Sequence, residues 1–150
     1  MPPVFRRAAR LLVLDEARRV LLFRHAPPGR EPVWATPGGG LEPGESFEDA
    51  ARRESVEELG APVRALTPAW EMVQHVTIGG RELVQHEQFF VVEVALPEIT
   101  PGSRASHAAE AVDRIRYWSV EELSATRETV RPADLAEHLM ALRADPGDSR

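Results

Sequence analysis

A helix bounded on both sides by glycine and proline organises this sequence. Residues 37–44 (PGGGLEPG) are too rich in these two residues to be helical. Ser46 begins a capping-box pattern, Gly60 suits the left-handed position that follows a helix, and Pro62 prevents its continuation. We therefore predict a helix over residues 46–59 with defined ends.

Three glutamates of this helix lie on its apolar face. At about 100° per residue, the side chains that share this face are Phe47, Ala50, Ala51, Glu54, Glu57 and Glu58. The first three form the stripe that must face the core, and the glutamates continue it. They also crowd the negative end of the helix dipole, where each carboxylate is disfavoured by about 0.3–1 kcal/mol. A solvated acidic face would lie opposite the stripe, so this position favours a divalent cation that supplies the missing positive charge.

The donor atoms indicate which ion and which substrate to expect. Carboxylates are hard oxygen donors, which suit Mg²⁺, with Mn²⁺ as a substitute, rather than zinc. Mg²⁺ keeps several waters and is shared with substrate phosphates, so the expected substrate is polyphosphorylated. The preceding Gly38, Gly39 and Gly40 let the backbone approach a metal or a phosphate closely. Alternatively, these glycines form only a sharp turn, and both interpretations stay open.

Strand-like runs surround the helix. The expected elements are a hairpin of residues 8–14 and 18–24, a longer hairpin of residues 70–78 and 83–95, an unusually long loop at 96–111, a strand at 115–118, a short helix capped by Ser119 and a last helix opened by Pro132. Trp34 and Trp70 are expected to pack in the core rather than to stack on a nucleobase. Strands interleaved with two substantial helices indicate an α/β sandwich with a mixed sheet. We expect one domain over residues 1–144 and a disordered tail at 145–150.

Residues 39–61 (GGLEPGESFEDAARRESVEELGA) resemble the Nudix box, which is Gly, five residues, Glu, seven residues, Arg-Glu, an aliphatic residue, any residue, Glu-Glu, any residue, Gly and an aliphatic residue. The matching positions are Gly39, Glu45, Arg53, Glu54, Glu57, Glu58 and Gly60. Ser55 and Ala61 depart from the pattern, because bulky aliphatic side chains are usual there. The resemblance implies a Nudix-type α/β/α sandwich. It also implies Mg²⁺-dependent cleavage of a pyrophosphate linkage in a nucleoside diphosphate derivative, such as a nucleoside triphosphate, a nucleotide sugar or a dinucleotide.

The same resemblance implies roles for individual residues. The Mg²⁺ ligands would be Glu54, Glu57, Glu58 and the backbone carbonyl of Gly38, and the substrate would lie against Gly39 and Gly40. Arg53 would orient a catalytic glutamate, and Glu45 would support Arg53. Glu54 is the first choice for the general base, and an acid from a distant loop is the second.

Two further candidates lie outside the box. Glu110, in the long loop, stands where relatives often carry an extra metal-binding acid, although Asp113 and Glu87 compete with it and a solvated charge is equally typical. Arg24 ends the second strand, where relatives often place a phosphate-binding base. The scattered histidines form no ligand spacing, and we interpret them as ordinary surface or core residues.

The composition limits which binding partners and which cellular location we expect for this protein. The 24 acidic and 18 basic residues give a net charge of −6, which argues against coating nucleic acid or an anionic membrane. The absence of cysteine excludes disulfides and thiolate metal sites. The N-terminus lacks the apolar core of a signal peptide, and no apolar run approaches the roughly 20 residues that cross a bilayer. We expect a cytoplasmic protein with a small nucleotide-type substrate, no membrane association and no stable nucleic-acid complex, and a homodimer is compatible with the sequence.

Two non-enzymatic functions stay open at this point. The chain could be a nucleotide sensor that binds without cleavage, or a scaffolding domain with a vestigial site. The complete acidic set disfavours both, because a pure binding module has no need of three inward glutamates. Downstream markers of the ADP-ribose, dinucleoside polyphosphate and NADH subfamilies are missing, and Tyr117 is the only tyrosine. The sequence therefore selects no particular substrate.

Overall fold

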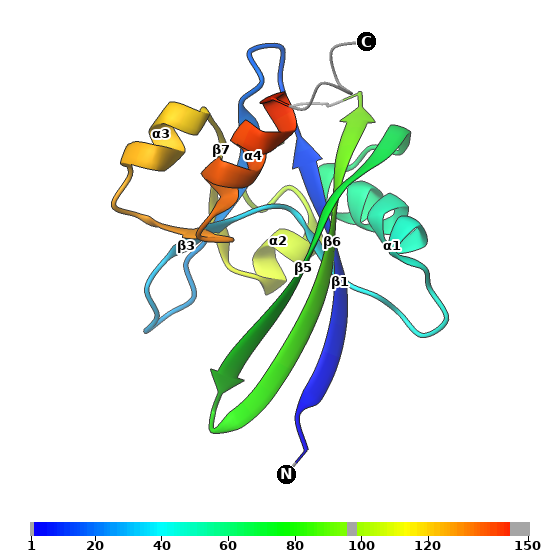
Figure 1. Cartoon of the computed structure of the whole chain (residues 1–150), viewed down its shortest axis with the longest axis vertical. Helices are drawn as coiled ribbons and strands as arrows, with labels where there is room; N and C mark the ends of the chain where they lie inside the picture. The colour runs from blue at the N-terminus through cyan, green and yellow to red at the C-terminus, as the bar shows by residue number, and fades with distance from the viewer. Residues whose placement is uncertain (1, 96–98, 145–150) are drawn as a thin grey trace. The chain divides into compact units, whose positions relative to one another are not determined.

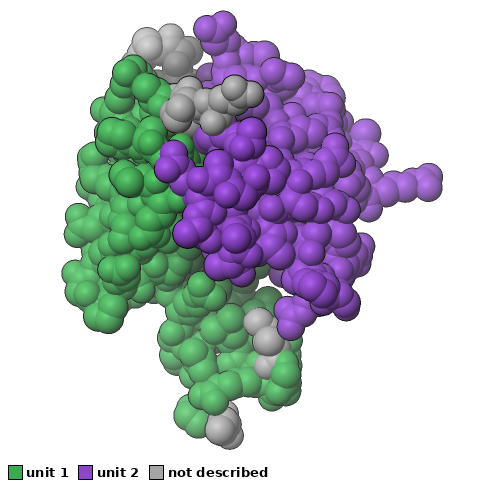
Figure 2. Space-filling view, turned by 180° about the vertical axis from the view of Figure 1, so that it is seen from behind, with its two compact units in different colours: residues 1–13, 37–98 green, residues 14–36, 99–150 purple. Residues whose placement is uncertain are grey.

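The chain forms two compact units, each with its own sheet. The computed structural model describes residues 2–95 and 99–144. Residues 1–13 and 37–98 make the first unit, and residues 14–36 and 99–150 make the second (Figure 2). Within the described residues each unit holds one four-stranded sheet with both parallel and antiparallel pairs. The mixed α/β class is confirmed, although the strands form two sheets where we expected one.

The first unit packs a helix against the sheet of order β4-β1-β6-β5 (Figure 1). Its elements are β1 (Val4–Val13), β4 (Gly38–Gly40), α1 (Phe47–Glu54), a π-helical turn η1 (Ser55–Leu59), β5 (Val63–Ile78) and β6 (Arg81–Val94). The buried Ala50 and Ala51 of α1 allow the helix to lie close to β1. Trp70 of β5 stacks on the buried Phe89 of β6 at 4.8 Å between ring centroids, so it packs as expected.

The second unit is built on the sheet of order β7-β2-β3-β8. Its elements are β2 (Val20–His25), β3 (Val33–Ala35), α2 (Ala105–Ala109), β7 (Val112–Trp118), α3 (Val120–Ala125), β8 (Thr129–Arg131) and α4 (Leu135–Ala144). Trp34 and Trp118 pack edge to face with centroids 5.1 Å apart. The indole nitrogen of Trp34 donates to Glu128, so the expectation that Trp34 packs in the core is confirmed.

The first predicted hairpin is wrong. β1 pairs over its whole length with β6 in parallel, and its other edge pairs with β4, so both edges are occupied. β2 lies between β7 and β3 in the other sheet. A single bridge between Leu14 and Val20 is what remains of the hairpin, around a turn in which Asp15 accepts from the backbone N–H of Arg19. Periodicity identified both strands, but it could not show that more distant strands compete for their edges.

The second hairpin is confirmed as β5 and β6, and the later elements differ in detail. The expected long loop contains α2, because residues 105–109 form a helical turn before β7. The strand β8 was missed, and α4 begins at Leu135 rather than at Pro132, since a turn follows this strand. Residues 96–98 and the tail at 145–150 lie outside the described residues.

The two ends of the predicted helix form as expected, but its last turn is wider. Ser46 accepts from the backbone N–H of Asp49 at 3.0 Å and completes a capping box, and Gly60 adopts φ 73°. Residues 55–59 are π-helical, with i→i+5 spacing. Ser55 is fully buried, and its hydroxyl donates to the carbonyl of Ala61 at 2.6 Å. The departure from the box at Ser55 therefore satisfies a backbone carbonyl that an aliphatic side chain would leave without this bond.

We expect Ser55→Ala to destabilise the protein. The substitution removes a buried hydrogen bond and leaves the Ala61 carbonyl without its donor, which costs about 1–3 kcal/mol. Urea unfolding of the variant measures this change in the free energy of unfolding. Val56→Ala, next along the turn but at a residue that is 52% exposed, is the matched control and should change stability far less. Equal stability of Ser55→Ala and the wild type would show that the hydroxyl does not hold this turn.

Candidate metal and catalytic site

The three helix glutamates of the first unit divide into two buried residues and one exposed residue. Glu54 and Glu58 are 7% and 1% exposed, whereas the Glu57 side chain is 47% exposed. The expectation that all three face inward is therefore wrong for Glu57. Its cause is the π turn, in which the 100° spacing of an α-helix no longer applies. Glu54 and Glu58 remain two oxygen donors on one buried face.

The glycines before the helix leave room for Glu54 and for β1. A Cβ added at Gly39 would lie 2.5 Å from Oε1 of Glu54, so a side chain there would displace the carboxylate. Gly38 has φ 134°, and a Cβ there would collide with the carbonyl of Ala9. Both glycines are thus required by close approach to protein groups, the Ala9 carbonyl and the Glu54 carboxylate. The expected sharp turn is instead the short strand β4, and approach of this backbone to a metal or a phosphate stays a prediction.

Arg53 connects the glycine strand, the turn and the helix. Its guanidinium donates to both carboxylate oxygens of Glu45 at 2.8 and 2.9 Å and to the backbone carbonyl of Gly40 at 2.9 Å. Its Nη1 donates to Glu54 and to Glu57, both at 3.0 Å. The pairing of Glu45 with Arg53 is confirmed. The contacts to Glu54 and Glu57 are the geometry that a residue orienting a catalytic glutamate requires.

The bidentate pairing of Arg53 with Glu45 shifts the pKa values of both side chains. The Arg53 guanidinium, together with the backbone N–H of Glu42, lowers the pKa of the Glu45 carboxyl to about 2. The hydrogen bonds to Glu45, and then those to Glu54, raise the pKa of Arg53 above its ordinary value. Arg53 therefore stays charged at every pH at which the protein is folded, and Glu45 stays ionised down to strongly acidic pH.

Because the pKa of Glu45 is lower in the folded chain than its ordinary value of 4.5, its contribution to stability is present above pH 4.5 and is lost as the pH falls toward about 2. We expect the stability difference between the wild type and Glu45→Gln to be largest near neutral pH and to shrink through this window. Thermal melts from pH 6 to pH 3 measure it. Glu48→Gln, on the exposed face of the same helix, is the control. A difference that stays constant with pH would contradict this role of Glu45.

The donor chemistry of the site fits a divalent cation. Glu54 and Glu58 are buried carboxylates on adjacent turns, and such oxygen donors are what Mg²⁺ takes from proteins. Within residues 2–95 and 99–144, however, no group of three or more acidic or histidine side chains is close enough to form a ready-made ligand set. Arg53 Nη1 instead donates to the carboxylates of Glu54 and Glu57.

Glu87, a competing candidate, lies on the other face of the first sheet. Both of its oxygens are engaged, by Nε of Arg10 at 2.7 Å and by the Gln74 amide at 2.6 Å, and it is 4% exposed. The next residue back, His86, contacts Phe47 of α1, so the alternation of β6 turns Glu87 away from the box helix. The spacing of the acidic residues did not predict this cluster, although a charged Arg10 inside an apolar strand run was a usable signal.

The other candidates belong to the second unit, where they form a group of their own. Arg24 donates to Asp113 at 2.7 Å, and a bulge between Arg24 and His25 leaves Asp113 as the extra residue opposite them. Glu110 ends α2, is 44% exposed, and its carboxylate lies 3.8 Å from Nδ1 of His25. Ligand spacing does not distinguish the histidines from one another, whereas in the structure His107 is fully buried with its ring edge-on to Phe23.

The domain model named NUDIX domain matches residues 4–139, which spans the box helix and elements of both units. The chain belongs to the NUDIX family. An RNA pyrophosphohydrolase of Afipia carboxidovorans is 34% identical over 92 residues, which are 54% of this chain and 55% of that protein. A nucleoside triphosphatase NudI of Escherichia fergusonii is 70% identical over 27 residues, 18% of this chain and 19% of its own. The chain thus spans about half or less of the length of these curated relatives.

A solved structure agrees with this membership at the level of fold. The NUDIX hydrolase from Nitrosomonas europaea has a TM-score of 0.64 at 21% identity, and the match covers 95% of this chain and 90% of that one. The resemblance stated from the box is therefore confirmed, and the NUDIX fold accounts for both sheets. In the described part of the chain, no helix is long and apolar enough to cross a membrane.

Proposed function

We propose that this NUDIX protein is a Mg²⁺-dependent hydrolase that cleaves a pyrophosphate linkage in a nucleoside diphosphate derivative. The observation that carries the proposal is the burial of Glu54 and Glu58 on one face of the box helix, beside a glycine that leaves room for the Glu54 carboxylate. Carboxylate oxygens on adjacent turns of one helix are the donors that Mg²⁺ takes from proteins. Metal binding would account for acidic side chains at two buried positions, where a purely structural helix carries apolar residues.

The metal would be held by Glu54, Glu57 and Glu58 together with the backbone carbonyl of Gly38. When bound, Mg²⁺ neutralises the diphosphate, polarises phosphorus and lowers the pKa of an attacking water. Arg53 positions the carboxylates of Glu54 and Glu57 through its two 3.0 Å hydrogen bonds. Glu54 is the proposed base, since it combines burial with this fixed orientation. Mn²⁺, with similar oxygen preference, is the proposed substitute metal.

Arg24 and Glu110, both in the second unit, are proposed from the family resemblance as a phosphate-binding base and a metal-binding acid. Arg24 carries the charge for the phosphate, and Asp113 holds its guanidinium in one orientation. Glu110 is the proposed additional metal-binding acid, because its carboxylate is accessible and lies at the end of α2. Gly39 and Gly40 offer backbone groups to the substrate, as the glycine strand lacks side chains there. A homodimer is also part of the proposal.

The relatives' names favour substrates that carry a triphosphate. One is named an RNA pyrophosphohydrolase and the other a nucleoside triphosphatase. A panel of nucleoside triphosphates, 5′-triphosphorylated oligonucleotides, nucleotide sugars and dinucleotides, assayed for phosphate and pyrophosphate release with Mg²⁺, tests the activity and selects the substrate class. Binding without release of any product would favour the alternative function of a nucleotide sensor. We further propose that residues 1–144 act as one domain in the cytoplasm.

Glu54→Gln and Glu58→Gln should each abolish most turnover while the fold is kept. Loss of a metal ligand removes several kcal/mol of transition-state stabilisation, and each ~1.4 kcal/mol is a tenfold loss in rate. Steady-state kinetics at saturating Mg²⁺ measure the effect. Glu48→Gln, the same change at an exposed residue of the same helix, should keep wild-type turnover. A variant of Glu54 or Glu58 with near-wild-type turnover would remove that residue from the site.

The thermal stability of Glu58→Gln, measured with and without Mg²⁺, tests whether Glu58 binds the metal independently of any effect on turnover. In chelator, neutralising a buried carboxylate near the negative end of the helix should stabilise the fold by about 0.3–1 kcal/mol. In millimolar Mg²⁺ the order should reverse, because the wild type binds the ion more tightly and gains stability by mass action. Thermal melts of both proteins under both conditions give the answer. Equal Mg²⁺ shifts would mean that Glu58 is not a ligand, and a variant less stable in chelator would contradict the strain argument.

A further inference from the structure

The edge strand β5 of the first unit is long, and its second half lacks the usual protection against pairing. In the described part of the chain, β5 has one strand neighbour, β6, and so its other edge carries unpaired ladder positions. Pro68 and a bulge between residues 68 and 70 interrupt its first half. Residues 70–78 (WEMVQHVTI) contain no proline, and Val73 is 59% exposed. Such an edge is a template for another strand.

The hairpin turn determines which backbone groups face this open edge. Gly79 and Gly80 have φ 58° and 76°, which is the signature of a two-residue type I′ turn. The residues that flank such a turn, here Ile78 and Arg81, form a hydrogen-bonded pair, and bonded and non-bonded pairs then alternate along the ladder. Val73, opposite His86, falls on a non-bonded pair. The N–H and C=O groups of residues 71, 73, 75 and 77 therefore point away from β6.

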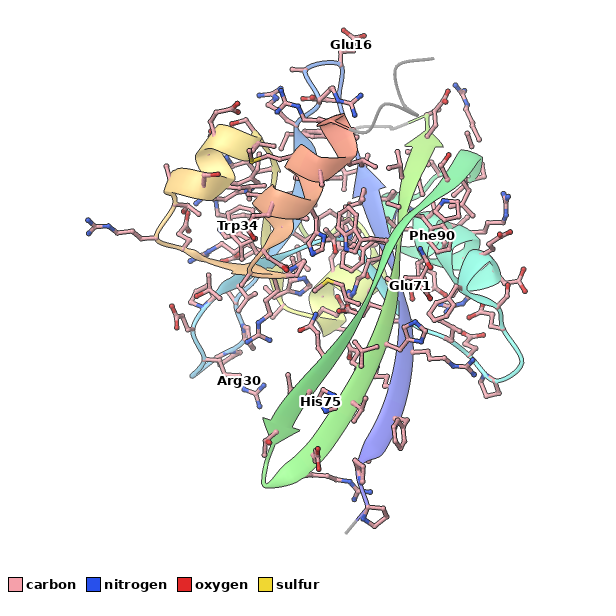
Figure 3. The ribbon with its side chains drawn as sticks, in the orientation of Figure 1. Glu16, Arg30, Trp34, Glu71, His75 and Phe90 are labelled. Atoms are coloured by element: carbon pink, nitrogen blue, oxygen red, sulfur yellow. The ribbon has the colours of Figure 1, made fainter. Side chains whose placement is uncertain are left out.

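The side chains on this edge are self-complementary about Val73. Glu71 and His75 are the only ionisable residues between 70 and 78, and both are exposed, with side chains 58% and 66% accessible (Figure 3). They lie two residues on either side of Val73. A two-fold axis through Val73 would place Glu71 of one chain opposite His75 of the other, twice, with Val73 against Val73 at the centre.

We propose that β5 is a homodimer interface, in which two copies of this chain pair their β5 strands antiparallel about Val73. In this register residues 71, 73 and 75 meet residues 75, 73 and 71 of the second copy. All of them have outward N–H and C=O groups, which gives about six backbone hydrogen bonds across the axis. The two first-unit sheets become one continuous sheet across the dimer.

Other symmetric registers are poorer. An axis through Glu71 brings two carboxylates together, and an axis through His75 brings two imidazoles together. An axis through Met72 places the apolar Val73 of one copy opposite Glu71 of the other. An axis through Gln74 places Val73 opposite His75, and neither register pairs the acid with the base. Within one chain, Glu71 already lies 2.9 Å from His86 and His75 lies 4.0 Å from Glu82, so each charge at the interface has a second partner on β6. A second copy is the occupant that carries the matching acid and base at this spacing by symmetry.

Sedimentation velocity of the full chain over a concentration series tests the interface. The wild type should show a concentration-dependent dimer. Val73→Pro should abolish it, because the substitution removes an outward N–H while the β5–β6 ladder keeps its bonds. His75→Glu should weaken the dimer at least about tenfold, since it faces Glu71 with a like charge. Glu71→Arg added to His75→Glu restores opposite charges and should restore dimerisation.

If Val73→Pro does not fold, His75→Glu and its combination with Glu71→Arg still test the interface. Far-UV circular dichroism and thermal melts of each variant show whether the fold is kept. A wild type that is monomeric at about 1 mM overturns the proposal. A dimer that persists in His75→Glu, or that the double variant fails to recover, also overturns it, because another surface would then hold the copies together. Binding of an extended peptide along β5 by a chain that stays monomeric would assign the edge to a different occupant and would likewise refute it.

Discussion

The paired guanidinium of Arg53 and carboxylate of Glu45 hold the first unit's site together. The Arg53 guanidinium donates hydrogen bonds to Glu45 in the turn before the helix, to the backbone carbonyl of Gly40 in β4, and to two helix glutamates, Glu54 and Glu57. Bidentate geometry keeps the guanidinium in one orientation, and the low pKa of Glu45 keeps the pair charged. The position of the Glu54 carboxylate against Gly39 follows from this arrangement, because the same cation holds it.

The helix glutamates differ in burial although they lie within five residues of one another. The α-helical part buries Glu54 beside Ala50 and Ala51, and the π turn buries Glu58 while it leaves Glu57 exposed. A regular helix would bring all three to one face. The Ser55 hydroxyl, bonded to the Ala61 carbonyl, gives that wider turn a hydrogen bond that the usual aliphatic residue lacks. A cation that binds here would compete with Arg53 for the carboxylates of Glu54 and Glu57.

Local sequence signals predicted the parts of the site that depend on near neighbours. The capping box at Ser46 and the left-handed Gly60 join residues within one turn and helix, where spacing fixes geometry, and the family resemblance added the Arg53–Glu45 pair. For the glycines at 38 and 39 the sequence left close approach and a sharp turn as open alternatives. Spacing could not reveal what each one approaches, which is the Ala9 carbonyl of β1 and the Glu54 carboxylate.

The sequence by itself determined the box helix, its bounds, the long β5–β6 hairpin and the membership that these residues imply, since each rests on local propensity or on a motif of closely spaced residues. Only the tertiary structure decided that β1 pairs with β6 and β4 rather than with β2, and that Glu87 faces away from the helix. Strand edges can be satisfied by any compatible partner, and the choice depends on the packing of distant segments. For the same reason, the free edge of β5 and its self-complementary charges became visible only once its partner β6 and the hairpin turn were known.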